Sequence, residues 1–246
     1  MEERKVGGKK MSDYNARCNL PHEETNRFKV YSGQINETIP RLLFDRRTFM
    51  SVADHVQRRM EVRREEISSF YLGHCFFTSD FLVNTREGKK VKVVLDLDEK
   101  NLQKINPKKR LVCGTGILLD DGVYDSIPGF EIKKEEIGKI DEPLSRMEAK
   151  THFIWRILLR HPGFVPKEKA VPGLLEEAVD FFFSKGKEDF GYEEAMTVRL
   201  GYSLKYRSTK SSEMLNPWAI YGSKGGCTVD SRSGFNYGQG LIVGEK

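Results

Sequence analysis

The sequence lacks the features that mark membrane and secreted proteins. No apolar run approaches the roughly 20 residues that a transmembrane helix needs, and the densest one, Phe181–Phe183, lies between Asp180 and Lys185. The first residues contain no apolar segment of the kind that a secretory signal carries. The four cysteines lie far apart and form no Cys-x-x-Cys pair. We therefore expect reduced thiols and a cytoplasmic protein without membrane contact, with a nucleus or virion left open.

Catalytic and cofactor-binding motifs are also missing. The sequence has neither the G-x-S-x-G turn of serine hydrolases nor the H-E-x-x-H helix of zinc proteases, and its five histidines are scattered. The segment Gly114-Thr115-Gly116 lacks the third glycine of a dinucleotide fingerprint, and Gly222–Gly226 lacks the residue order of a phosphate-binding P-loop. We predict no catalytic residue, no metal site and no cofactor.

The composition is that of a folded globular chain. Hydrophobic residues make up 38% and charged residues 31% of its 246 residues, and 15 Phe and 9 Tyr suit a large core or interface. The formal net charge of +5 permits contact with nucleic acid or with an acidic partner, but does not require either.

The patterning predicts an α+β fold with a mainly antiparallel sheet and a packed N-terminal helix, followed by a helical segment and a glycine-rich β/loop tail. Residues 1–26 are polar and aperiodic, which indicates a flexible arm. Residues 27–133 form the β-rich core, with a strand over 27–33 and an amphipathic helix over 46–62 that Asp45 caps. The turn near Gly88 joins two β-prone runs, 81–83 and 91–95, into a hairpin.

Residues 134–246 hold the helical segment and the glycine-rich tail, which we expect to pack on the same core. Ser145 and Glu148 match a capping box at the start of a helix. Pro172 opens a second helix that Lys185-Gly186 ends, and residues 193–199 are consistent with a short third one.

Basic and aromatic side chains interleave over residues 202–210, as they do in nucleic-acid-binding surfaces that combine base stacking with phosphate contacts. A second basic strand face is formed by Lys90 and Lys92. The candidate nucleic-acid-binding residues are Tyr202, Lys205, Tyr206, Arg207, Lys210, Lys90 and Lys92. The alternative is that these lysines and arginines only solvate the exposed sides of their elements.

Residues 42–119 resemble an MPN domain in the order of their elements. The resemblance rests on a helix with Ser51-Val52-Ala53-Asp54-His55, a strand with Phe70-Tyr71-Leu72-Gly73 and the segment Ile105–Gly116. The H-x-H…S-x-x-D metal pattern of active members is absent, and the helices after residue 143 do not follow the family. The resemblance covers about a third of the chain and implies a non-catalytic subunit of a larger complex.

Two functions follow from the sequence. The first is a non-enzymatic binding or assembly subunit, with protein partners or self-assembly and with nucleic acid as a further partner. The second is a metal-dependent enzyme acting on nucleic acid or nucleotides, with scattered ligands at Asp54, His55, Asp96 and Asp98. The missing motifs favour the first.

Overall fold

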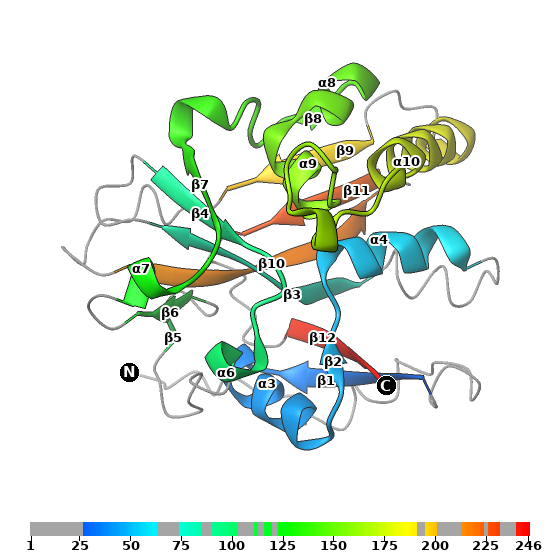
Figure 1. The fold of residues 1–246 in the computed structure, drawn as a ribbon. Coiled ribbons are helices and arrows are strands. Elements are labelled where there is room, and N and C mark those ends of the chain that lie inside the picture. Colours follow the sequence, from blue (N-terminus) through cyan, green and yellow to red (C-terminus); the bar gives the residue numbers. More distant parts are fainter. Residues whose placement is uncertain are drawn as a thin grey trace, which may run out of the picture.

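The fold is built on one mixed sheet (Figure 1). The computed structural model describes residues 27–62, 74–84, 90–102, 111–112, 116–119, 123–190, 195–200, 213–223, 226–231 and 240–246. Within these ranges twelve strands join the sheet, and its main path runs in the order β1-β12-β3-β10-β11-β9-β8. The predicted arm over 1–26 and the aromatic and basic segment over 201–210 lie outside the described residues.

The strands of the main path differ in length, from two residues to ten. They are β1 (Phe28–Gly33), β3 (Cys75–Asn84), β8 (Pro143–Leu144), β9 (Met196–Arg199), β10 (Met214–Ser223), β11 (Gly226–Asp230) and β12 (Gly240–Glu245). The strands that branch from it are β2 (Thr48–Phe49), β4 (Lys90–Val94), β5 (Leu111–Val112), β6 (Gly116–Leu118) and β7 (Phe130–Lys133).

Helices cover both faces of the sheet (Figure 1). They are α3 (Ile35–Phe44), α4 (Val52–Glu61), α6 (Glu99–Leu102), α7 (Val123–Ser126), α8 (Arg146–Thr151), α9 (Phe153–Leu158) and α10 (Leu174–Phe190), with 3₁₀ turns at Lys134–Glu136 and Lys167–Lys169. In the described part of the chain, no helix is long and apolar enough to cross a membrane.

The pairing is mainly antiparallel, as the sequence predicts. Only β12 with β3 and β11 with β9 run parallel among the described pairs. The predicted α+β fold is therefore confirmed. The divisions predicted at residues 27 and 134 stay predictions.

Strand alternation divides the apolar side chains between two cores. On β12, Leu241 and Val243 pack with α4 and α8 to α10, whereas Ile242 faces α3. The first core includes Trp155 and Trp218, both fully buried. The second core lies beneath α3 and α6 and forms the floor of the candidate site described below.

Several local predictions are confirmed. The hairpin pairs β3 with β4, with Leu82 opposite Val93. Ser145 and Glu148 form the predicted capping box, with each side chain accepting from the other's backbone N–H. In both cases the signal is local, because the pairing or the cap involves residues close in sequence.

Other local predictions are wrong. The helix predicted over 46–62 begins at Val52, and its cap is Ser51 rather than Asp45. Residues 196–199 form a strand instead of a helix, and α10 continues through Gly186 to Phe190. The glycine-rich tail supplies β12, which lies inside the sheet between β1 and β3.

Candidate functional site

The corner at which α3 passes into β2 gathers the most exposed large apolar side chain of the described residues. Phe44, the last residue of α3, is 87% exposed. Arg41 in the last helical turn and Arg46 just after the helix are also exposed. Neither guanidinium makes a hydrogen bond or an ion pair within the described part of the chain. We refer to Arg41, Phe44 and Arg46 as the Phe44 face.

A shallow groove of about 320 Å³ adjoins the Phe44 face, lined by Lys29, Tyr31, Pro40, Arg41, Phe44 and Asp45. Within it, Lys29 and the Tyr31 hydroxyl both donate to Asp45 Oδ2. These donors hold the pKa of Asp45 below its usual range. Lys29 and Asp45 thus neutralise each other, which leaves Arg41 and Arg46 to set the charge of the face.

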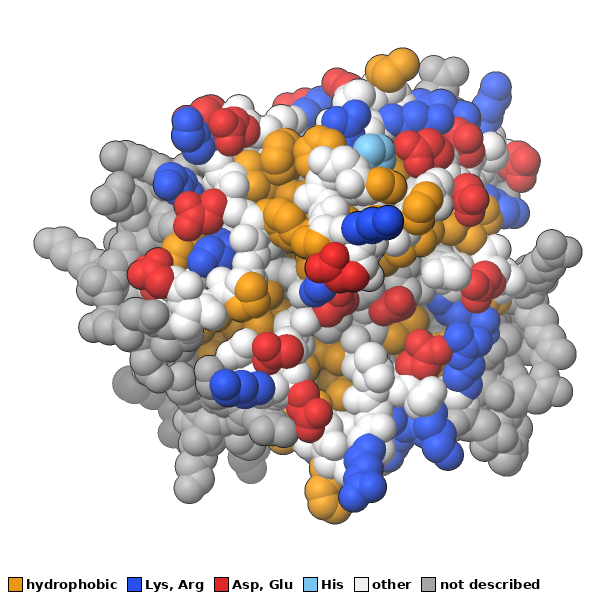
Figure 2. Space-filling view, viewed as in Figure 1, with side chains coloured by type: hydrophobic (Ala, Val, Ile, Leu, Met, Phe, Trp, Pro, Cys, Tyr) orange, Lys and Arg blue, Asp and Glu red, His pale blue; other side chains and the backbone are white. Residues whose placement is uncertain are grey.

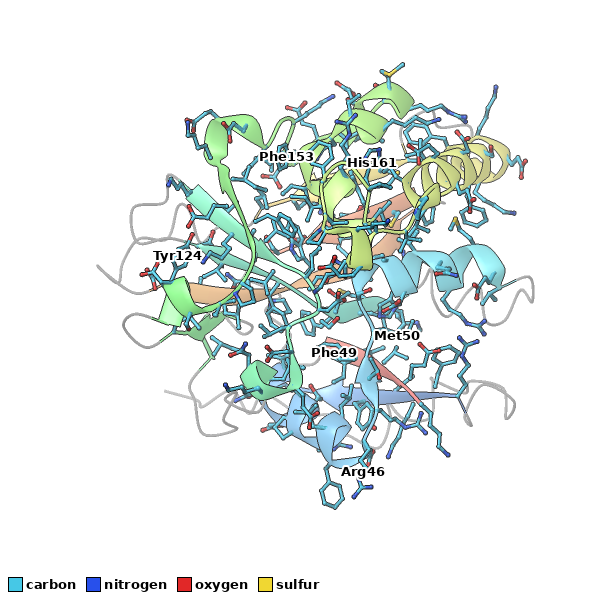
Figure 3. The ribbon with its side chains drawn as sticks, in the orientation of Figure 1. Arg46, Phe49, Met50, Tyr124, Phe153 and His161 are labelled. Carbon is cyan, nitrogen blue, oxygen red and sulfur yellow. The ribbon has the colours of Figure 1, made fainter. Side chains whose placement is uncertain are left out.

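Arg46 adopts a backbone conformation that glycine normally occupies at this position. Its φ is 54°, and its N–H donates to Leu43 O at 3.0 Å to close the end of α3. A left-handed residue other than glycine, asparagine or aspartate is uncommon, because its Cβ crowds the following carbonyl. Figure 3 shows Arg46 at the outer edge of the molecule, with Phe49 and Met50 further in along the same segment.

A deeper cavity of about 650 Å³ lies beside this corner, at the surface seen in Figure 2. Its walls come from four segments of the chain: residues 43–49, Asp54 in α4, Ser79 in β3 and residues 96–102. The lining residues are Leu43, Arg46, Arg47, Thr48, Phe49, Asp54, Ser79, Asp96, Leu97, Asp98, Glu99 and Leu102. The apolar members are joined to the second core, while the charged members stand at the rim.

A buried ion pair holds the wall of the cavity in place. Asp80, fully buried, accepts hydrogen bonds from Val52 N (2.8 Å), Asp96 N (3.0 Å) and the Arg160 guanidinium (2.9 Å). Burial raises the pKa of Asp80, and the guanidinium opposes that shift. Arg160 also donates to Asp96 Oδ1 at 2.7 Å, and Lys169 donates to Asp96 Oδ2 at 3.3 Å. The pair therefore ties α4, β3 and the segment after β4 to the end of α9.

Two carboxylates at the rim each use one oxygen for a helix cap. Asp54 Oδ2 accepts from Ser51 N and Ser51 Oγ, both at 2.8 Å, in the capping box of α4. Asp98 Oδ1 accepts from Asn101 N at 2.7 Å at the start of α6. Their second oxygens remain at the rim. Both residues were singled out from the sequence as candidate metal ligands, but their role in capping helices was not predicted.

Ser79 is the polar side chain that lies deepest in the cavity wall. It is 4% exposed, and its Oγ is buried with no hydrogen-bond partner in the described part of the chain. Alternation along β3 places it on the strand face of Phe77 and Phe81, which belong to the second core. A buried hydroxyl normally has a partner, so this one is a candidate ligand contact.

The structure separates the residues predicted to bind nucleic acid. Lys90 is exposed and forms an ion pair with Glu131 at 3.3 Å. Lys92 is 6% exposed, and its ammonium donates to Tyr124 O (2.8 Å) and Ile127 O (3.1 Å) beneath the Tyr124 ring. The prediction of a basic strand face is therefore wrong for Lys92, since its charge holds α7 instead of facing solvent. Tyr202, Lys205, Tyr206, Arg207 and Lys210 lie outside the described residues, and that surface stays a prediction.

The four residues proposed as scattered metal ligands do not face one point. Asp54, Asp96 and Asp98 line the cavity, but His55 is fully buried on the other side of α4, stacked on Phe76 at 5.2 Å. Burial, with a smaller effect of Arg59, lowers the pKa of His55 to about 3. Within the described ranges, no group of three His, Cys, Asp or Glu residues is arranged to hold a metal ion.

Sequence comparison finds no relative of this chain: no family model and no curated protein matches it. A solved structure does match its fold, that of a chain described as "Accommodation of massive sequence variation in Nanoarchaeota by the C-type lectin fold". The two chains share 12% identity, and the superposition covers 89% of this chain and 98% of the other with a TM-score of 0.55. This similarity replaces the MPN resemblance as the description of the architecture. The protein has a C-type lectin-like fold.

Proposed function

We propose that this chain is a non-enzymatic binding protein that uses the Phe44 face to hold a protein partner with an acidic segment. The observation that carries the proposal is an almost fully exposed phenylalanine between two arginines whose guanidinium groups make no hydrogen bond or ion pair in the described part of the chain, although Arg41 lies over the Tyr31 ring at 5.8 Å. Aromatic residues and arginine are the types enriched at the energetic centres of protein interfaces.

Charge complementarity selects the kind of partner. Since Asp45 is already neutralised by Lys29, an incoming carboxylate meets Arg41 and Arg46 without a competing negative charge in the groove. An apolar side chain of the partner fits beside Phe44 and Pro40. Burying the ring of an exposed phenylalanine contributes about 1.5–3 kcal/mol, which is a large part of a weak complex.

The similarity to the Nanoarchaeota-related chain supports a binding role. That chain's description credits the C-type lectin fold with accommodating massive sequence variation. A fold that accommodates such variation suits recognition better than catalysis, which needs fixed groups at fixed distances.

The proposal predicts the composition and the contacts of peptides selected for binding. Random 12-residue peptides displayed on phage should yield sequences in which Asp or Glu flanks an apolar residue. In isothermal titration calorimetry with a selected peptide, Phe44→Ala should weaken binding about tenfold or more, because an interface anchor of about 1.4 kcal/mol is lost. Raising the salt concentration should weaken binding to the wild-type protein more than to Arg41→Ala.

Two variants make this test specific. Met147 is 71% exposed on α8, so Met147→Ala removes a comparable exposed apolar group and should leave binding unchanged. Arg46→Gly should weaken binding without lowering stability, because glycine accepts the left-handed conformation without strain. Selected peptides without acidic residues, or with equal affinity for Phe44→Ala, would refute the proposal.

Other occupants of the face give different results. If a labelled single-stranded RNA binds and Arg46→Ala removes the binding, the partner is nucleic acid and the proposal is wrong. If analytical ultracentrifugation shows a dimer that Phe44→Ala dissociates, the face serves self-association, which also contradicts it.

A further inference from the structure

We propose that the cavity beside β2 is a binding site for a short zwitterionic peptide, a di- or tripeptide with free amino and carboxyl ends and an apolar side chain. The site shares Arg46 with the Phe44 face, but neither Arg41 nor Phe44 lines the cavity, so the inference rests on the cavity's own lining. Its volume of about 650 Å³ is within the range of small-molecule sites.

The floor of the cavity offers an apolar subsite. Phe49, Leu97 and Leu102 are each 4–5% exposed and pack in the second core. Leu43 is partly exposed at the edge of the same cluster. An apolar side chain on the ligand extends this surface and excludes water from the floor.

The rim carries charges of both signs, as a zwitterion requires. Asp54 Oδ1 and Asp98 Oδ2 accept no hydrogen bond from the described residues, so both can receive the donors of an ammonium group. The guanidinium of Arg46 offers a bidentate contact to a carboxylate. Arg47, by contrast, is engaged with the carbonyls of Arg27 and Gly244. A ligand with a single charge leaves one side of this rim unmatched.

The buried Ser79 hydroxyl supplies the observation that points to a ligand rather than to a charged surface. It lines the cavity, is 4% exposed and has no partner in the described part of the chain. A peptide group in the cavity provides the acceptor or donor that this hydroxyl lacks, whereas an apolar chain does not.

The cavity is also held rigid before binding. Ser79 N donates to Met50 O and Leu97 N donates to Ser79 O, both at 2.9 Å, so the strand that carries Ser79 is fixed on both sides. Asp80 and Arg160 hold Asp96, which precedes the lining residues Leu97 and Asp98. A preformed site binds without the cost of ordering its own walls.

The direct test is isothermal titration calorimetry of the full chain with the dipeptide Leu-Leu. The free dipeptide should bind. N-acetyl-Leu-Leu and Leu-Leu-amide, which each lack one terminal charge, should bind at least about tenfold more weakly. Asp98→Asn should reduce the penalty of acetylation, and Arg46→Gln should reduce the penalty of amidation, since each variant removes the partner of one terminus.

Ser79→Ala separates a ligand contact from a structural role. It should weaken dipeptide binding several-fold while leaving the Tm equal or higher, because it removes a buried hydroxyl that the fold does not pair. The matched control is Ser231→Ala. Ser231 is 1% exposed with an equally unpaired Oγ but does not line the cavity, so this variant should not change affinity.

Each remaining outcome decides the matter. Equal affinity for the free and blocked dipeptides, or no binding at millimolar concentration, would refute the proposal that the cavity binds a zwitterionic peptide. If free leucine binds as tightly as Leu-Leu, the ligand is a single amino acid, and the proposal of a peptide ligand is wrong. Phe44→Ala should leave dipeptide binding intact, so failure of the proposed partner surface and failure of this site are seen separately.

Discussion

Replacing Asp80 with alanine should lower the free energy of unfolding by about 3–5 kcal/mol, as expected when one partner of a buried ion pair is removed. Arg160 is 3% exposed and would keep its charge after the loss of Asp80, with only the half-exposed carboxylate of Asp96 as its remaining partner. Two backbone N–H groups, those of Val52 and Asp96, would lose their acceptor as well. Urea denaturation followed by circular dichroism measures the change. Dipeptide binding should fall with it, because the wall at Asp96 loses its brace.

An exposed ion pair provides the matched control. Arg146 and Asp180 lie 2.9 Å apart with about half of each side chain exposed, so Asp180→Ala should cost only about 0–1 kcal/mol. The double variant Asp80→Leu/Arg160→Met should recover much of the stability lost in Asp80→Ala, since it leaves no unpaired charge. If Asp80→Ala lowers the free energy of unfolding no more than Asp180→Ala does, the buried ion pair does not hold the cavity wall in place.

Helix caps and turns between neighbouring strands could be predicted because their signals are local. The capping box depends on Ser145 and Glu148, three residues apart, and the hairpin joins the neighbouring strands β3 and β4. By contrast α3 was not predicted, and it contains Pro40, a residue that normally disrupts a helix interior. Packing against the second core through Ile35, Ile39 and Leu42 stabilises the helix despite this.

One of the wrong predictions concerns an element that pairing with a distant strand creates. β9 was read as a helix, but it lies parallel to β11, and a parallel neighbour far along the chain leaves no periodic signal of its own. The glycine-rich tail was predicted to mix strand and loop, but the position of its strand inside the sheet could not be predicted. Gly244 allows close packing there, since a Cβ would lie 2.9 Å from Arg47 Cβ.

The candidate site was only partly visible in the sequence. Asp54, Asp96 and Asp98 were singled out, but as metal ligands, and the partners that occupy their oxygens could not be inferred from spacing. Asp80 carried a usable signal, because a carboxylate inside the apolar run of β3 has to be paired when that run is buried. Ser79 and Phe44 carried none, since exposure and an unpaired hydroxyl depend on the assembled fold.

Lowering the pH from 6.5 to 4.5 should reduce the free energy of unfolding through His55 by about 2–3 kcal/mol. Burial lowers the pKa of His55 to about 3, so in this range the unfolded chain binds a proton at this residue and the folded chain does not. The unfolded state is therefore stabilised relative to the folded state as the pH falls. The free energy of unfolding stops decreasing only when the pH approaches the pKa of His55 in the folded state. Burial lowers the pKa of His152 as well, which adds a loss of the same sign.

Comparison with His55→Phe isolates this contribution. Phenylalanine keeps a ring against Phe76 but cannot titrate, and any constant packing penalty cancels when stability at pH 4.5 is subtracted from that at pH 6.5. The variant should lose less stability over the range than the wild type, and His152 should account for part of what remains. In an NMR titration, the ring protons of His55 should not shift between pH 8 and 4.5. A midpoint near 6.5 for His55, or an unchanged acid loss in His55→Phe, would show that this side of α4 is open to water.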